Sequence, residues 1–247
     1  MRMGDWLMSK NARRFATTRW TLVLTARDAS SPDARQALEM LCAQYWYPLY
    51  AFLRRQGYDA EKAQDLTQGF FARLLEKHYL DDVRPERGRF RTFLLTSLKH
   101  FVLNEHDREQ AVKRGRGVRV LPLEIETAEG LYALEPRDDT TPERLFERRW
   151  ALTVLDQTLT KVRSEYAAAG KDALFDRLRP YLVREDDTQP YTTLGPELGM
   201  TEGAVRVAVH RLRRRFAALL RTEIANTVSN DQEVEAEIEY LAAVVRR

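Results

Sequence analysis

Cysteine is almost absent from the 247-residue sequence, which contains only Cys42 and therefore can form no internal disulfide and no cysteine-based zinc cluster. The four histidines are spaced unlike a zinc-binding HExxH motif, and no glycine-rich phosphate-binding loop occurs. We therefore expect a protein that holds no metal or cofactor and is not an enzyme. The thiol of Cys42 lies in the apolar run LCAQYW and is expected to be buried and inert.

Long hydrophobic runs are also missing. No stretch approaches the roughly 18 apolar residues that a membrane-spanning helix needs, and the first residues form no hydrophobic signal segment. With 44% hydrophobic and 31% charged residues, the composition is that of a soluble globular protein. These features predict a cytoplasmic location and no membrane partner.

Net charge is only +3, but its distribution is uneven. Residues 108–119 and 206–221 are basic, whereas residues 124–143 are mostly acidic. A charge run alone usually marks a solvated helix face. A basic run indicates nucleic-acid binding when it lies on a helix that has other features of a nucleic-acid-binding helix.

The alternating pattern of strands is nearly absent, apart from a possible short strand at residues 119–123. We predict an all-α fold with two helical domains joined by a flexible linker, the second containing a helix-turn-helix. The predicted boundaries are an N-terminal arm 1–31, a first domain 32–117, a linker 118–142, a second domain 143–222 and a tail helix 223–247. The tail helix is expected to cover the second domain.

Residues 191–215, YTTLGPELGMTEGAVRVAVHRLRRR, have the pattern of a short helix, a turn and a longer helix. Gly199 suits the left-handed residue that ends the first helix, and Thr201 can cap the second. An apolar stripe of the second helix is expected to face inward, and the opposite side carries arginines that can pair with guanine edges or phosphates. This outer face consists of Arg206, Val207, His210, Arg211 and Arg214. The pattern predicts a helix that lies in the DNA major groove, with a solvated basic helix as the alternative.

Two blocks of the sequence resemble a known family. Residues 45–116, with YPLYAFLRRQGYDAEKAQDLTQGFFARLLEK and RPERGRFRTFLLTSLKHFVLNEHDR, resemble region 2 of extracytoplasmic-function sigma factors, which are sigma-70-like subunits of bacterial RNA polymerase. Residues 151–220 resemble region 4 of the same family. The resemblance implies that region 4 reads the −35 promoter element. It also implies that region 2 captures and melts the −10 element while holding the clamp helices of core polymerase.

Carried onto this sequence, the resemblance assigns bases of the −35 element to Arg206, Val207, His210 and Arg211, and leaves residues 213–215 to phosphate contact or packing. It places −10 DNA at the long helix 90–108 and the loop before it. The donors there are Arg89, Arg91, Lys99, His100 and Asn104. Cationic and aromatic groups together suit single-stranded DNA, because bases stack while phosphates are neutralised. Two roles are left open: Phe93 can stack on bases or pack in the core, and His100 can contact bases or be an ordinary helix-surface residue.

The helix at residues 61–76 is predicted to carry a partner surface, because Phe71 and Leu75 would be exposed beside polar groups. The resemblance identifies the partner as the clamp helices. The surface consists of Gln64, Asp65, Gln68, Phe71 and Leu75. Family members typically carry several acids here, as in AEDLVQE, whereas this chain has AQDLTQG. Phosphate on Thr67 would restore about 1.5 to 2 negative charges, so we hypothesise activation by a serine/threonine kinase, with an unmodified threonine as the alternative.

One alternative from another functional class is an autonomous helix-turn-helix regulator that binds duplex DNA without polymerase. Such regulators usually carry a clear dimerisation element, which this sequence does not display. The resemblance also allows an anti-sigma protein as a partner. The N-terminal arm or the tail helix is hypothesised to hold the two domains in an inactive form.

Overall fold

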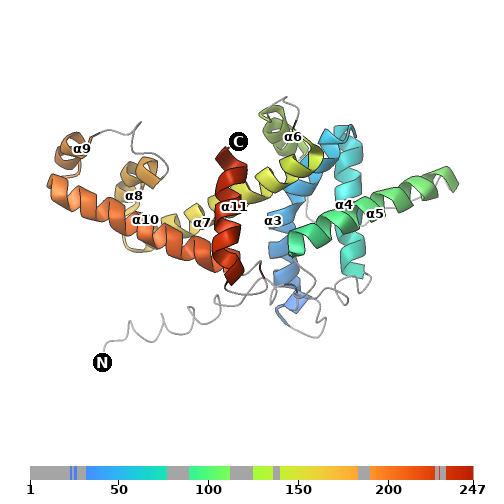
Figure 1. Cartoon of the computed structure of the whole chain (residues 1–247), viewed down its shortest axis with the longest axis horizontal. Coiled ribbons are helices and arrows are strands. Elements are labelled where there is room, and N and C mark those ends of the chain that lie inside the picture. The colour runs from blue at the N-terminus through green and yellow to red at the C-terminus, as the bar shows by residue number, and fades with distance from the viewer. Residues whose placement is uncertain are drawn as a thin grey trace. The chain divides into compact units, whose positions relative to one another are not determined.

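The computed structural model describes residues 23, 25–26, 32–76, 89–111, 125–135, 140–182, 190–225, 228 and 232–246. Within these residues the chain contains helices and turns but no strand, which confirms the all-α prediction (Figure 1). The elements are α3 (Ala34–Arg55), α4 (Ala60–Glu76), α5 (Phe90–Ala111), α6 (Ile125–Ala133), α7 (Pro142–Ala168), α8 (Asp172–Leu178), the 3-10 helix η2 (Arg179–Leu182), α9 (Tyr191–Glu197), α10 (Glu202–Ala225) and α11 (Gln232–Arg246).

The chain divides into two compact units. Unit 1 comprises the described residues up to Thr153 together with those from Ile224 onward, and unit 2 comprises Val154–Glu223. The division differs from the predicted one in two respects. The first part of α7 belongs to unit 1, and so does α11, which we expected to cover the second domain. Most of the predicted arm 1–31 and the possible strand at 119–123 lie outside the described residues.

In unit 1, the sequence sets a sharp turn between α3 and α4. Gly57 has a φ of +99°, a left-handed conformation that glycine adopts without strain. Asp59 then accepts a hydrogen bond of 2.7 Å from the backbone N–H of Lys62 and caps α4. The turn brings α3 and α4 into contact, and α5 packs on α4 (Figure 1).

Aromatic side chains dominate the core of unit 1. Tyr45, Phe71 and Trp150 are each at most 1% exposed. Tyr45 meets Phe90 edge to face, with ring centroids 5.6 Å apart. Cys42 is buried beside this core, and its burial raises the pKa of the thiol to about 11. The predicted burial of this thiol is thereby confirmed.

The predicted linker contains a helix, α6, which contacts both α3 and α4. Glu129 of α6 accepts hydrogen bonds from Arg54 Nε at 2.8 Å and Arg54 Nη2 at 2.9 Å, and a third from the hydroxyl of Tyr50. The Arg54 guanidinium also lies 4.8 Å from the ring centroid of Tyr132. The predicted flexible linker thus includes a helical segment at residues 125–133, which a bidentate ion pair anchors to α3.

Acid should weaken the docking of α6. The hydrogen bonds from Arg54 hold the pKa of Glu129 below its ordinary value. A carboxyl with a lowered pKa in the folded state adds stability above its unfolded pKa, and this stability is lost as pH falls through the folded pKa. We expect Glu129→Gln to lower the melting temperature near neutral pH, and the difference from wild type to shrink below about pH 4.3. Thermal melts followed by circular dichroism would check this, and a difference independent of pH would contradict it.

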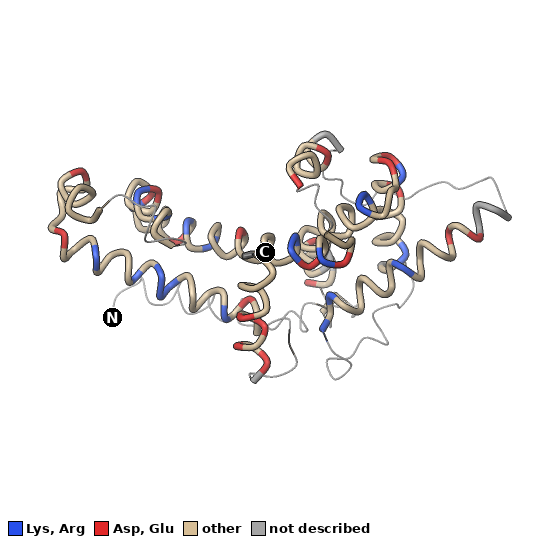
Figure 2. The backbone as a smooth tube through the Cα atoms, turned by 45° about the horizontal axis from the view of Figure 1, so that its top comes forward, with Lys and Arg blue, Asp and Glu red and all other residues tan. Residues whose placement is uncertain are grey.

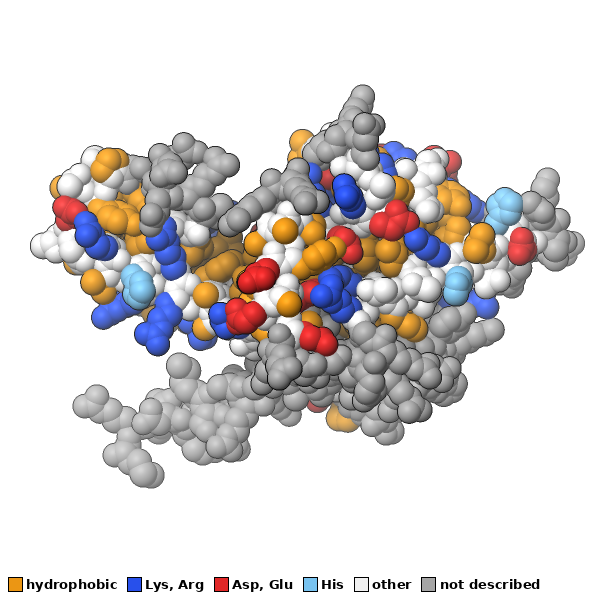
Figure 3. Space-filling view, in the orientation of Figure 1, with side chains coloured by type: hydrophobic (Ala, Val, Ile, Leu, Met, Phe, Trp, Pro, Cys, Tyr) orange, Lys and Arg blue, Asp and Glu red, His pale blue; other side chains and the backbone are white. Residues whose placement is uncertain are grey.

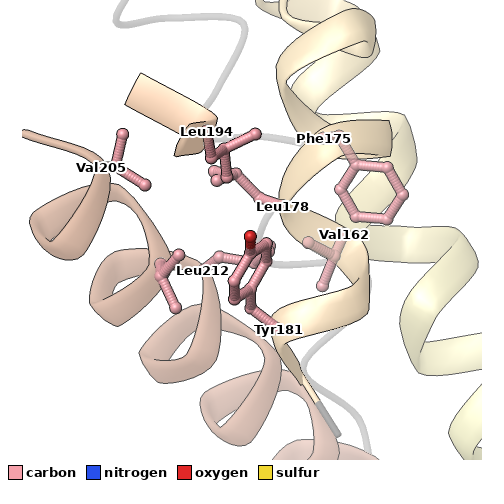
Figure 4. Packing of buried hydrophobic residues seen from close by; sticks show 8 residues of the cluster. Val162, Phe175, Leu178, Tyr181, Leu194, Val205 and Leu212 are labelled. Atoms are coloured by element: carbon pink, nitrogen blue, oxygen red, sulfur yellow. The ribbon is translucent and has the colours of Figure 1, made fainter. Parts of the chain in front are cut away.

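Unit 2 is built around one apolar cluster to which α7, α8, η2, α9 and α10 all contribute (Figure 4). Val162, Phe175, Leu194, Val205 and Leu212 are each at most 1% exposed. Since Val205 and Leu212 lie on one side of α10, their burial fixes the rotation of this helix about its own axis.

The turn between α9 and α10 has the local chemistry that the sequence predicts. Gly199 has a φ of +63°, and Thr201 Oγ1 accepts a hydrogen bond of 3.2 Å from the backbone N–H of Ala204. The turn also approaches α9 closely. A Cβ atom at Gly195 would lie 2.7 Å from the backbone oxygen of Met200.

Candidate nucleic-acid interface

The outer face of α10 is exposed along its length. Val207 is 49% exposed, while Val205 and Val209 on the opposite side are buried. Figure 2 shows basic residues recurring along this helix. All five residues predicted to meet the major groove are exposed on this face, namely Arg206, Val207, His210, Arg211 and Arg214. The face therefore combines cationic forks with one small apolar side chain.

The arginines at the end of this basic run have different surroundings. Arg213 Nε donates a hydrogen bond of 2.8 Å to the backbone oxygen of Tyr181, and Arg215 Nε donates one of 2.7 Å to Glu165 Oε2. Arg213 is half-buried and thus serves packing within unit 2, one of the two roles that the resemblance left open, whereas Arg215 forms an exposed ion pair with Glu165. Arg206 pairs with Glu202, one turn away at 2.7 Å, and both side chains are exposed. An exposed pair of this kind is weak and readily exchanged for a phosphate.

On α5, part of the predicted −10 site lies at the surface. His100 and Asn104 are exposed, and Leu103 between them is 64% exposed. The opposite side of α5 is buried and includes Phe90, Leu94, Leu98 and Phe101. Phe93 is half-buried and stacks on Phe90 with ring centroids 6.0 Å apart, so it takes part in packing.

The three cations of the predicted −10 site are held by carboxylates. Lys99 Nζ lies 2.7 Å from Glu143 Oε1, and this bond holds the pKa of Glu143 below its ordinary value. Arg89 Nη2 lies 3.0 Å from Glu237 Oε2, and Arg91 Nη1 donates a hydrogen bond to Glu237 Oε1. The structure therefore separates the predicted residues into an exposed pair, His100 and Asn104, and three cations with acidic partners.

Two residues of α4 contradict the predicted partner surface. Phe71 is 1% exposed and Thr67 is fully buried, with its hydroxyl donating a hydrogen bond of 2.7 Å to the backbone oxygen of Ala63. The predicted exposure of Phe71 is wrong, because α3, α5 and α6 all contact α4 and together bury a broad stripe of it, which also includes the phosphorylation candidate Thr67. The remaining residues are less buried: Asp65 is exposed, and Gln64 and Gln68 are half-buried. The side chain of Leu75 lies outside the described part of the chain.

The segment that holds α4 and α5 can be compared with known families. Residues 42–112 match the family model described as sigma-70 region 2. This segment therefore belongs to the sigma-70 region 2 family. The role of this family is promoter recognition with RNA polymerase, so the region 2 segment implies core polymerase and promoter DNA as partners. No curated protein and no solved structure matches the chain.

The sequence did not reveal the acids that hold the cations of the region 2 segment. Glu143 and Glu237 are 44 and 146 residues away from their partners Lys99 and Arg91, so no local spacing reveals them. The only available signal was an acid on an otherwise apolar stripe, since Glu237 follows Val234 by three residues and precedes Leu241 by four. Among the described residues, no cluster of potential metal ligands is present. No helix in the described ranges has the length and apolar character needed to cross a membrane.

Proposed function

We propose that this chain is a sigma factor that directs core RNA polymerase to specific promoters by reading the −35 element with the outer face of α10. The observation that carries the proposal is the contrast between neighbouring arginines. Arg211 and Arg214 are exposed on the face that also holds His210, whereas Arg213 and Arg215 bind acceptors within unit 2. A face that keeps guanidinium forks exposed beside an apolar side chain suits base edges and thymine methyl groups.

The second part of the proposal concerns the −10 element. The exposed stripe of α5 offers His100 and Asn104 as hydrogen-bonding groups and Leu103 as an apolar contact for an unstacked base. Lys99 lies next to His100, and Arg89 and Arg91 lie at the start of α5. We propose that these cations neutralise the DNA backbone once they are released from Glu143 and Glu237. Gln64, Asp65 and Gln68 of α4 remain the proposed contact with the clamp helices, and the protein is a specificity subunit without enzymatic activity of its own.

Because Thr67 is buried, its phosphorylation requires a conformation of the protein in which α4 is uncovered. A kinase can reach this hydroxyl only when α4 is uncovered, so phosphorylation would have to follow the displacement of a neighbouring helix. Membership of the extracytoplasmic-function subgroup, an anti-sigma partner and a cytoplasmic location stay predictions from the sequence.

Promoter selection by reconstituted holoenzyme tests the proposal. Sequencing the start sites used by core polymerase with this chain identifies its promoters. We then expect Arg211→Ala to weaken holoenzyme binding to a selected promoter by about tenfold, in the range of one lost base contact. Arg163→Ala is the matched control, because Arg163 is 58% exposed in the same unit but lies on α7. Its binding should stay within about twofold of wild type.

The outcomes separate the two functions. Equal promoter affinity of both variants would overturn the role of α10 in reading DNA. If the chain bound specific duplex DNA but formed no holoenzyme, the autonomous regulator would be the correct interpretation.

A further inference from the structure

The helix α11 follows the DNA-reading helix in sequence but packs within unit 1. Its buried face holds Val234 and Leu241, as expected of an amphipathic helix. The same face also holds a carboxylate, because Glu237 is fully buried. A buried carboxylate requires charged or hydrogen-bonding partners, so the surroundings of Glu237 show what this helix is built to contact.

The partners of Glu237 are the two arginines at the start of α5. Arg91 is 3% exposed and donates to Glu237 Oε1, and Arg89, which is 37% exposed, lies 3.0 Å from Glu237 Oε2. One carboxylate thus bridges two guanidinium groups. Figure 3 shows acidic side chains of α11 beside basic side chains at the start of α5.

A second residue of α11 completes the contact. The ring centroid of Tyr240 lies 5.5 Å from Arg89 Cζ and 5.2 Å from Arg91 Cζ, and its hydroxyl donates a hydrogen bond to Glu147 of α7. On another side, Arg91 Cζ lies 4.4 Å from the ring centroid of Trp150. The guanidinium of Arg91 is therefore surrounded by aromatic rings and capped by a carboxylate.

An acid is not needed here for stability alone. Replacing a buried ion pair with apolar groups is often neutral or stabilising. The Glu237 pair is therefore better explained as fixing where α11 packs than as adding stability. A carboxylate also offers arginine the same paired oxygen acceptors as a phosphate. The arginine pair can therefore bind either Glu237 or a DNA backbone phosphate, but not both at once.

We propose that α11 is an internal competitor for the −10 site, with Glu237 occupying the Arg89–Arg91 pair until single-stranded DNA displaces it. This inference rests on the −10 role proposed above for Arg89 and Arg91. It assigns to the tail a regulatory function within unit 1, unlike the bridging of two domains that the sequence suggested.

The test compares two variants with the same change in net charge. Glu237→Gln removes the buried carboxylate but keeps an oxygen acceptor, and Glu239→Gln removes an exposed carboxylate from the same helix. The probe is a labelled single-stranded DNA of random sequence, about 20 nucleotides long, bound to the full chain and followed by fluorescence anisotropy. If α11 is docked in about nine of ten molecules, Glu237→Gln should bind about tenfold more tightly than wild type, and Glu239→Gln within about twofold.

Hydrogen exchange on wild-type protein gives an independent measurement, which holds even if Glu237→Gln folds poorly. Saturating single-stranded DNA should speed amide exchange in residues 232–246. No change in this exchange, or equal DNA affinity of the two glutamine variants, would overturn the internal competition. Adding Arg89→Ala to Glu237→Gln separates the proposed competition by α11 from the proposed −10 role of Arg89. If this double variant keeps the full affinity of Glu237→Gln, Arg89 is not a DNA contact and the proposed −10 role itself fails.

Discussion

Replacing Thr67 with glutamate is expected to lower the free energy of unfolding of unit 1 by about 3 kcal/mol or more, because it places a longer, charged side chain in a closed site. Thr67 is fully buried, and its hydroxyl is already satisfied by the backbone oxygen of Ala63. The matched control is Thr67→Val, which keeps the shape and loses only this local hydrogen bond. It should change stability by about 1 kcal/mol or less.

Tryptophan fluorescence during urea unfolding suits this comparison. The tryptophans of the described residues, Trp46 and Trp150, are buried and both belong to unit 1. A glutamate variant as stable as wild type would show that the covered face of α4 opens readily. That result would support kinase access to Thr67, whereas the expected loss would mean that a phosphomimetic variant measures unfolding rather than activation.

Replacing Gly195 with alanine is expected to destabilise unit 2 by about 3 kcal/mol. The new Cβ would lie 2.7 Å from the backbone oxygen of Met200 and 3.6 Å from the backbone nitrogen of Glu202. Backbone atoms cannot rotate away, so α9 must move from the turn. Because Leu194 beside it belongs to the buried cluster, the shift should also disturb the packing of α10 against this cluster.

Gly203 provides the control, since a Cβ there would meet no atom within 4 Å and the position is helical. Gly203→Ala should stabilise α10 by about 0.5 to 1 kcal/mol, as expected for alanine replacing glycine in a helix. Hydrogen exchange in residues 191–225 would report both effects. If both variants slowed exchange equally, the close approach of α9 to the turn would not limit stability.

The sequence alone was a good guide wherever the information was local. The faces of α10 follow from helical spacing, and its start follows from Thr201, so the exposure of Arg211 and the burial of Leu212 were predictable. The family resemblance similarly located region 2, which the family model confirms for residues 42–112.

Features created by tertiary packing were not predictable in this way. Phe71 of α4 was predicted to be exposed because periodicity does not show how many helices cover one helix. The docking of α6 depends on a pair between Arg54 and Glu129, which are 75 residues apart. Each residue of such a pair looks like an ordinary surface charge until the fold brings the two together.

Glu237 lies on the same polypeptide as Arg89 and Arg91, so the occupancy of their contact does not depend on the amount of protein in the cell. A tethered ligand acts at an effective concentration set by the chain that links it to its site, not by the concentration of the protein. Its occupancy is therefore independent of how much protein a cell makes, and dilution cannot release it. A separate inhibitor protein can be titrated out by overproduction of its target. The contact between Glu237 and the arginine pair, being intramolecular, is occupied to the same extent in every molecule.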